Sequence, residues 1–249
     1  MHEDIKIHIP IIILDISLLM EAFLTLYNRV YGDIALSIGY ILFIISVSLL
    51  VWRSVWILFL TGSLIGFIFE AIGVRTGFPF GGYEYLLFKE SNIFGVPIPI
   101  IFTWGIYISI AYLAASYYTS RFRWVVAASL LVILDMAIDP IMVSLGVWRW
   151  NTHTFLKWFG IPYTNFIGWF IVTAISILIT AISILIYDYW NRSVEPRYNN
   201  VLSVTPYLLL YPTLVILAPR EVYLAILYSL IIALIFLTLT SVIKLYRRG

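Results

Sequence analysis

Eight long apolar stretches, separated by short polar or aromatic segments, dominate the pattern of residues along the chain. A membrane-spanning helix needs about 20 apolar residues, because the hydrocarbon core is about 30 Å thick and offers no water to backbone polar groups. The pattern therefore predicts an all-α, polytopic membrane bundle of seven or eight transmembrane helices. The predicted spans are Ile9–Tyr27, Ile34–Val51, Val55–Gly73, Val96–Tyr118, Trp124–Leu145, Phe166–Tyr187, Leu202–Leu217 and Val222–Ile243. The first span, which carries Asp15 and Glu21, and the short, proline-bearing seventh span are the least regular.

Bulk composition agrees with a membrane protein. Hydrophobic residues make up 62% of the 249 residues and charged residues 11%, against roughly 45–50% and about 25% in soluble domains. No polar or Pro/Gly-rich linker separates two blocks of different character, so we predict one transmembrane domain over residues 1–249. Lys and Arg fall nine against six on the two predicted sides, which predicts a multi-pass protein of the cell membrane with both termini in the cytoplasm.

Several classes of chemistry are excluded by the residues that the chain lacks. The absence of cysteine excludes disulfides, thiolate nucleophiles and Cys-ligated metal sites. Three dispersed histidines are too few for a histidine-rich iron site. No Asp-rich repeat, glycine-rich nucleotide loop or Ser-His-Asp set is present, and a net charge of +2 with scattered basic residues indicates no nucleic-acid partner. We therefore predict chemistry without a metal or a cofactor.

One order of features occurs twice along the chain. An acidic helix end, an arginine, aromatic residues and a Phe-Gly-x-Pro segment follow one another in two places. These are Glu70, Arg75 and Phe94–Pro97 in the first copy, and Asp139, Arg149 and Phe159–Pro162 in the second copy. The two Phe-Gly-x-Pro segments lie 65 residues apart. The repetition predicts two parallel helix–loop–helix units that face one site from the same side of the membrane. Interfacial loops are also rich in aromatic residues, glycine and proline for general reasons, which is the alternative interpretation.

Carboxylates within apolar spans are the first candidates for chemistry, since each costs roughly 2.5–3.5 kcal/mol to insert. Asp135 and Asp139 are four residues apart and share one face of a helix. In a low-dielectric interior such a pair keeps at least one proton at neutral pH, because desolvation and repulsion both penalise two charges. Glu70 is the third candidate, and Arg75 is predicted to set its charge state. Alternatively, the acids are structural and bond neighbouring helices or the arginines.

Aromatic side chains near these acids are candidates for binding an apolar substrate. Gly and Pro residues fix the turns of the loop that follows Arg75, and its aromatic side chains suit a cap over an apolar cavity. Electron-rich rings also stabilise cations. The predicted substrate-binding residues are Phe80, Tyr83, Tyr85, Trp104, Trp148, Trp150, Asn165 and Trp169. For most of the rings, an aromatic belt at the membrane surface is an alternative role.

The same region resembles a known family. The matching segments are Glu70–Tyr85, Phe94–Pro97, Asp135–Pro140, Gly146–Trp150 and Phe159–Trp169. They are similar to the carotenoid biosynthesis protein family, which includes the carotenoid hydratases of the bacterioruberin and 1′-hydroxy carotenoid pathways. The similarity covers about residues 60–170. It implies addition of water to a terminal double bond of an acyclic carotenoid or related polyisoprenoid, within membrane lipid.

A mechanism follows from combining these residues with that substrate. Protonated Asp139 or Asp135 donates a proton to the terminal alkene, water captures the resulting tertiary carbocation, and Glu70 positions or deprotonates the water. A lycopene-type cyclase starts with the same protonation, although its Pro-x-Glu-Glu/Asp signature is missing here. A non-catalytic carotenoid- or lipid-binding protein or transporter is the third hypothesis. The sequence leaves the oligomeric state open.

Overall fold

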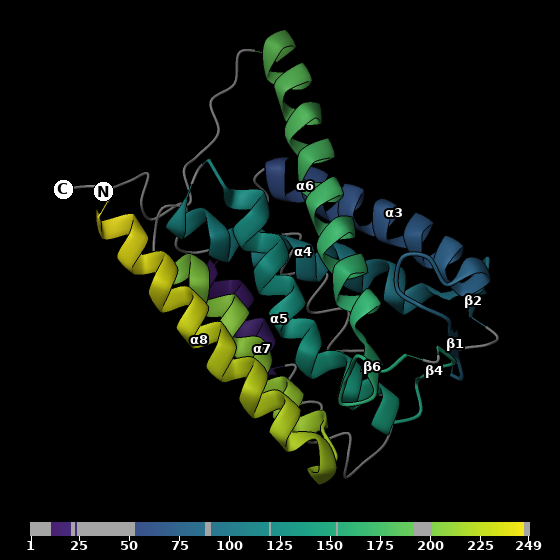
Figure 1. The fold of residues 1–249 in the computed structure, drawn as a ribbon. Helices are drawn as coiled ribbons and strands as arrows, with labels where there is room; N and C mark the ends of the chain where they lie inside the picture. The colour runs from purple at the N-terminus through teal and green to yellow at the C-terminus, as the bar shows by residue number, and fades with distance from the viewer. Residues whose placement is uncertain are drawn as a thin grey trace.

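The computed structural model describes residues 11–20, 23, 53–87, 91–119, 121–152, 154–191 and 201–246. A first helix covers Ile11–Met20. The labelled elements (Figure 1) are α3 (Arg53–Thr76), β1 (Tyr83–Tyr85), β2 (Asn92–Ile93), β3 (Val96–Pro97), α4 (Ile98–Tyr118), α5 (Arg123–Ser144), β4 (Trp148–Trp150), β5 (Lys157–Trp158), β6 (Ile161–Pro162), α6 (Tyr163–Asn191), η1 (Val201–Val204), α7 (Thr205–Leu217), η2 (Arg220–Val222) and α8 (Tyr223–Tyr246). The predicted span Ile34–Val51 and Glu21 lie outside the described residues.

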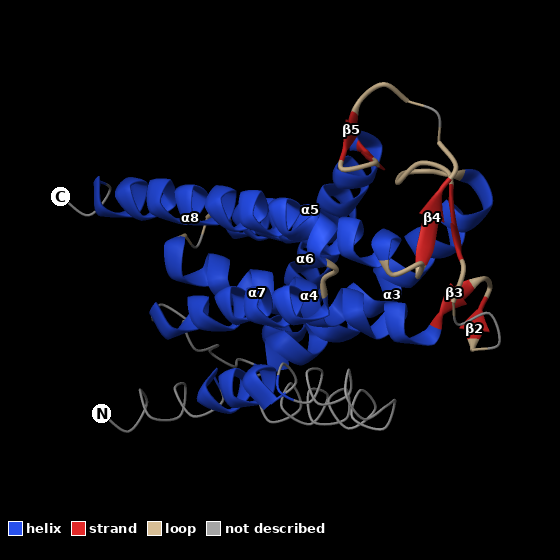
Figure 2. Ribbon diagram, turned by 90° about the horizontal axis from the view of Figure 1, so that it is seen from below, coloured by secondary structure: helices blue, strands red, loops and turns tan. Residues whose placement is uncertain are grey.

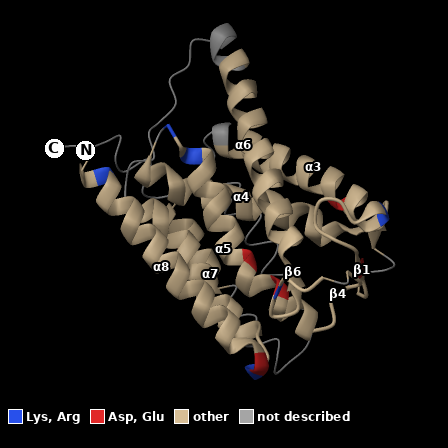
Figure 3. Cartoon of the chain, viewed as in Figure 1, with Lys and Arg blue, Asp and Glu red and all other residues tan. Residues whose placement is uncertain are grey.

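Five described helices are long and apolar enough to cross a membrane, which confirms the predicted all-α membrane bundle. They are Val55–Thr76, Ile98–Tyr118, Arg123–Ser144, Tyr163–Ile186 and Arg220–Tyr246. The α7 helix has 13 residues and is about 20 Å long at 1.5 Å per residue, shorter than the hydrocarbon core. Charged positions are sparse along the helices, and acidic ones stand out on α5 (Figure 3).

Two predicted helix starts were wrong by a few residues. Val96 was expected to open the fourth span, but Val96–Pro97 pairs with β2, so α4 begins at Ile98. The sixth span was expected to begin at Phe166, whereas α6 begins at Tyr163, directly after β6. In both cases a short hairpin occupies the segment before the helix and sets the point at which the chain enters the bundle.

The α5 helix lies inside the bundle. Of the most apolar 18-residue stretch of α5, 72% is buried, against 33–56% for the corresponding stretches of the other four spans. The helix packs against α4, α6 and α8. The outward faces of α3, α6 and α8 carry large exposed apolar side chains such as Leu64, Leu185 and Leu234, as suits contact with lipid. The carboxyl groups on α5 are therefore placed away from the lipid.

Close approach of α3 to α4 depends on a glycine. A Cβ atom added at Gly66 would lie 2.3 Å from Cγ of Trp104, which is closer than atoms can approach. Small residues of this kind let membrane helices pack backbone against side chain. Because Gly66 has no side chain, the Trp104 side chain can lie close against the backbone of α3.

The two long loops meet at one end of the helices. Strand β1 pairs antiparallel with β4, so that Tyr83 lies opposite Trp150, Glu84 opposite Arg149, and Tyr85 opposite Trp148. Figure 2 shows β2, β3 and β4 gathered on one side of the helices. The pairing of β1 with β4 brings the two loops together, as a shared site would require, and the predicted repeat of two parallel units stays a prediction. Below, β1 and β4 together are called the ribbon.

Both Phe-Gly-x-Pro segments form the same hairpin. In β2–β3 and in β5–β6 a two-residue turn joins strands of two residues each. Phe94 and Gly95 have φ values of 53° and 88°, and Phe159 and Gly160 have 46° and 88°. Two successive positive φ angles are typical of the type I′ turn that closes two-residue hairpins. The segments that carry the sequence repetition thus fold alike.

Candidate active site

A cavity of about 480 Å³ lies beneath the ribbon, between α3, α4, α5 and α6. Its size falls within the roughly 300–1,000 Å³ of typical ligand pockets, and its wall is mainly apolar with a few polar groups, as such pockets usually are. The structure brings ten of the twelve predicted site residues together in this wall. They are Glu70, Phe80, Tyr83, Tyr85, Trp104, Asp139, Trp148, Trp150, Asn165 and Trp169.

Glu70 accepts hydrogen bonds from three donors at the cavity wall. The hydroxyl of Tyr85 donates to Oε2 at 2.7 Å, the indole Nε1 of Trp104 donates to Oε1 at 3.0 Å, and the hydroxyl of Tyr83 also donates to Oε2. An ionised carboxyl group only accepts hydrogen bonds, so three converging donors suit it better than they suit the protonated acid. This surrounding favours Glu70 as a proton acceptor.

Tyr83 and Tyr85 remain neutral donors. Burial, followed by the nearby charge of Glu70, raises the pKa of both phenols well above the usual value for tyrosine. At neutral pH each hydroxyl therefore keeps its proton and donates it in a hydrogen bond. Their strand β1 holds both rings on the face of the ribbon that lines the cavity.

Asp135 and Asp139 are bridged by one amide group. Nδ2 of Asn165 donates to Oδ2 of Asp135 at 2.7 Å and also to Oδ2 of Asp139. All three side chains are buried, at 0–2% exposed. Two carboxylates so close in a buried site do not both ionise, so at least one of the two keeps a proton. Asp139 lines the cavity and Asp135 does not, so Asp139 is the member that a bound molecule meets.

Neither predicted arginine reaches the buried acids. Arg75 donates from Nη1 to the carbonyl oxygen of Ala71 at 2.8 Å and lies over the ring of Phe94. Five residues of helix separate it from Glu70, about 140° around the axis, so the two side chains point in different directions. The predicted control of Glu70 by Arg75 is therefore not supported by the geometry.

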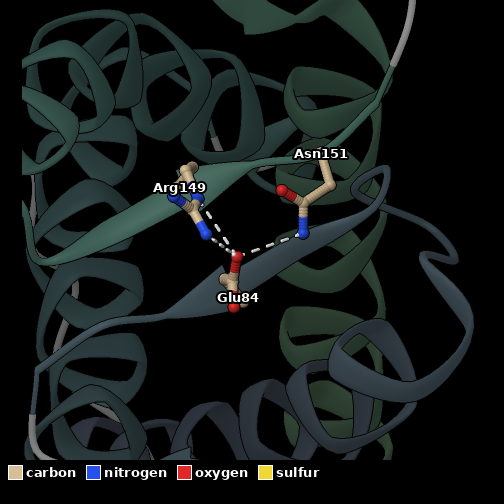
Figure 4. A network of polar contacts seen from close by, with 3 residues as sticks. All are labelled: Glu84, Arg149 and Asn151. Carbon is tan, nitrogen blue, oxygen red and sulfur yellow. Dashed lines mark hydrogen bonds and ion pairs between the residues drawn. The ribbon is translucent and has the colours of Figure 1, made fainter.

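Arg149 binds an exposed partner on the outer face of the ribbon. It donates to Oε1 of Glu84 from Nη2 at 2.6 Å and from Nε at 3.1 Å, and Asn151 donates to the same oxygen (Figure 4). Alternate residues of a strand face opposite sides. This charged pair therefore faces outward, whereas the four aromatic side chains of the ribbon face the cavity.

Aromatic rings surround the acids. Trp104 stacks on Trp169 with centroids 4.1 Å apart, and Phe80 packs against Trp104 at 6.0 Å. Across the ribbon, Tyr83 contacts Trp150 at 5.1 Å and Tyr85 contacts Trp148 at 5.9 Å. The face of an aromatic ring stabilises a positive charge that lies within about 6 Å of its centroid.

An apolar extension of the cavity was not predicted from the sequence. A second cavity of about 50 Å³ between α4, α5 and α7 shares part of its wall with the first. The shared residues are Thr103, Tyr107, Ile138, Met142 and Leu217. Tyr107 follows Trp104 by three residues on α4, and Met142 follows Asp139 by three on α5, so helical spacing would have indicated these two of the five.

The acids do not form a metal site in the part of the chain that the structure describes. No group of three or more His, Asp or Glu side chains there lies close enough to hold one ion. Asp15, the other described carboxylate singled out in an apolar span, accepts a hydrogen bond from Oγ1 of Thr205 at 2.5 Å. It joins the first helix to α7 and does not line the cavity.

Comparison with known proteins adds to this geometry. The model of the family described as "Carotenoid biosynthesis protein" matches residues 28–239. The chain belongs to the carotenoid biosynthesis protein family. This finding confirms the resemblance seen in the sequence and extends it to most of the chain.

One curated relative has a named activity. A protein of Haloarcula japonica, named bisanhydrobacterioruberin hydratase, is 26% identical over 124 residues. The alignment covers 47% of this chain and 41% of the relative, so the chain matches less than half the length of that protein. No solved structure matches.

Proposed function

We propose that this protein is a hydratase that adds water to a terminal isoprenoid double bond of an acyclic carotenoid or related polyisoprenoid. The observation that carries the proposal is one apolar cavity whose wall holds two carboxyl groups with different hydrogen-bond partners. Asp139 shares the amide group of Asn165 with a second acid, Asp135, whereas Glu70 accepts hydrogen bonds from three donors. Two titratable groups with such different surroundings are the usual arrangement of an acid and a base.

Asp139 is the proposed acid. Its proton goes to the less substituted carbon of the terminal alkene, because the positive charge then falls on the tertiary carbon. The π electrons form the new C–H bond and Asp139 becomes a carboxylate. Asn165 stabilises that carboxylate with its N–H donor, while Asp135 keeps its own proton.

Glu70 is the proposed base. A water oxygen gives a lone pair to the tertiary cation, and one proton of that water passes to Glu70, which leaves a neutral tertiary alcohol. Return of this proton to Asp139 through water completes the cycle. Tyr83, Tyr85 and Trp104 take the role first assigned to Arg75, since they are the groups that bond Glu70. The stacked Trp104 and Trp169 rings border the cation.

The apolar extension toward α7 supports a long apolar substrate. The cavity of about 480 Å³ offers room for an isoprenoid end beneath the ribbon, and the wall at Tyr107 and Met142 that it shares with the second cavity gives the direction proposed for the rest of the molecule. Named activity in the Haloarcula japonica relative supports hydration over cyclisation. A cyclase of the lycopene type and a non-catalytic carotenoid binder or transporter remain the competing functions.

An isotope experiment separates these functions. Membranes or purified protein are incubated without O₂ with an acyclic carotenoid in ¹⁸O-labelled water. A hydratase adds one labelled water per reacting end, a cyclase gives an isomer of unchanged mass, and a binder or transporter gives no new compound. We expect the first result. A requirement for O₂, or an unlabelled product oxygen, would contradict the proposal.

A further inference from the structure

Two indole N–H groups in the cavity wall have no acceptor within the described residues. These are Nε1 of Trp148 and Nε1 of Trp150, both shielded from the surface of the protein. Both side chains line the cavity, and Trp148 is 9% exposed. An indole N–H only donates, and buried donors nearly always have a partner. The pair therefore indicates an acceptor that is not part of this wall.

Position on the ribbon shows which acceptor the described residues offer and which donors already use it. Tyr83 and Tyr85 on β1 lie opposite Trp150 and Trp148 on β4, and all four face the cavity. The two tyrosine hydroxyls donate to Glu70. The ribbon thus carries four donors, and Glu70 satisfies two of them.

A carboxyl group lies on the other side of these indoles. Trp148 approaches Asp139 closely enough to interact with it, but its N–H makes no hydrogen bond of normal geometry there. A small molecule between them would need an oxygen that accepts from N–H and a hydrogen that donates to an oxygen of the carboxyl group. Water has both, and so does the tertiary alcohol formed from it.

We propose that Trp148 and Trp150 bind the oxygen of the water that captures the carbocation. This inference rests on the proposed hydration and assigns the two indoles a role beyond bordering the cation. Before the reaction the oxygen accepts one N–H and directs its other lone pair at the tertiary carbon. Once the C–O bond has formed and a proton has passed to Glu70, the alcohol oxygen has two lone pairs for both indoles.

Holding this water determines the fate of the cation. A cation that meets no water returns a proton to a carboxylate and becomes an alkene again. In D₂O the proton first delivered is a deuteron, so part of the recovered alkene carries deuterium. The ratio of hydrate to deuterated alkene therefore measures water capture separately from protonation.

Trp148→Phe, Trp150→Phe and the double variant test the inference, because each keeps an aromatic ring and removes the N–H. Incubation in D₂O with an acyclic carotenoid should still place deuterium in the recovered alkene. We expect the ratio of hydrate to deuterated alkene to fall roughly tenfold in the double variant, and by less in each single variant. Single variants keep the test available if the double variant does not fold.

Trp158→Phe is the matched control. Its Nε1 donates to the carbonyl oxygen of Met136 at 2.9 Å, and its side chain does not line the cavity, so the ratio should stay at the wild-type value. An unchanged ratio in the Trp148 and Trp150 variants would overturn the inference, as would equal loss of deuterium uptake and hydrate in folded protein. If the wild type forms neither hydrate nor deuterated alkene, hydration itself fails, which is a distinct result.

Discussion

Glu70 and Asp139 differ in what surrounds them, and this difference assigns their roles. Glu70 receives three hydrogen bonds from neutral donors, whereas Asp139 shares the single amide donor of Asn165 with a second acid. Asp139→Asn and Glu70→Gln each remove a proton-handling group with little change of shape. We expect each to lower turnover by at least about 10²-fold, the lower end for a general acid or base.

Asp135→Asn is the matched comparison for this prediction. It changes the same residue type one helical turn away, within the same Asn165 bridge, but its side chain does not line the cavity. Turnover should therefore fall less than in Asp139→Asn. Product formation is measured by chromatography of extracted pigments, with folding checked by circular dichroism in detergent. Near wild-type turnover in Asp139→Asn would show that another group donates the proton.

At this scale the sequence predicted which side chains gather but not all their partners. Carboxylates are conspicuous in apolar spans, which is why Glu70, Asp135 and Asp139 were found. Tyr83 was predicted to border a substrate, and its bond to Glu70 depends on how β1 lies over α3, which no local pattern encodes. Arg75 was misplaced because nearness in sequence was taken for nearness in space, although five helical residues turn the side chain away.

At the scale of elements, the α3–α4 contact holds Trp104 against Glu70. Replacing Gly66 with alanine favours the helix by about 1 kcal/mol through propensity. The added Cβ, however, would lie 2.3 Å from the Trp104 ring, and overpacking costs about 1–3 kcal/mol. We expect the clash to prevail, so that Gly66→Ala lowers both thermal stability and product formation.

Leu64→Ala on the same helix controls for the Gly66 prediction. Leu64 is 56% exposed on the outer face of α3, so its truncation should leave the thermal midpoint and turnover close to wild type. Unfolding of purified protein in detergent, followed by the retained helical signal, measures both variants. Equal stability of Gly66→Ala and wild type would mean that α3 and α4 pack less closely than described.

Helices were predicted well from hydrophobic pattern and the strands were not. Apolar runs identified every described span to within a few residues, because lipid demands long apolar helices. Strands of two or three residues carry no detectable period, and the pairing of β1 with β4 joins segments 65 residues apart. The Phe-Gly-x-Pro segments were recognised as helix entries, but the type I′ hairpins that build them were not.

At the scale of the whole molecule, the sequence repetition relates residues that contact each other. With the spacing of 65 residues, Glu70 corresponds to Asp135, Trp104 to Trp169, and Glu84 to Arg149. Two of these corresponding pairs touch each other, Trp104 with Trp169 and Glu84 with Arg149. Contacts between equivalent residues are typical of a two-fold axis. We interpret the cavity as lying at the junction of two similar helix–loop–helix units.

Parallel units related by an axis along the membrane normal place both long loops on one side of the membrane. Single cysteines test this arrangement, because the native chain has none. Ser91 and Lys157 are exposed in the first and second loop, and Arg121 is exposed between α4 and α5. We expect Ser91→Cys and Lys157→Cys to react with a membrane-impermeant maleimide from outside the cell.

Arg121→Cys should react from the cytoplasmic side, since α4 carries the chain from the loops to the opposite end of the bundle and positive charge favours the cytoplasm. Labelling of intact cells and of inverted vesicles separates the two sides, and permeabilised cells show that each cysteine is reactive. Reaction of Ser91→Cys and Lys157→Cys from opposite sides would contradict the pairing of β1 with β4. If Ser91→Cys and Lys157→Cys react from the cytoplasmic side and Arg121→Cys from outside, the arrangement of the helices is supported but the orientation of the bundle in the membrane is opposite to the one predicted.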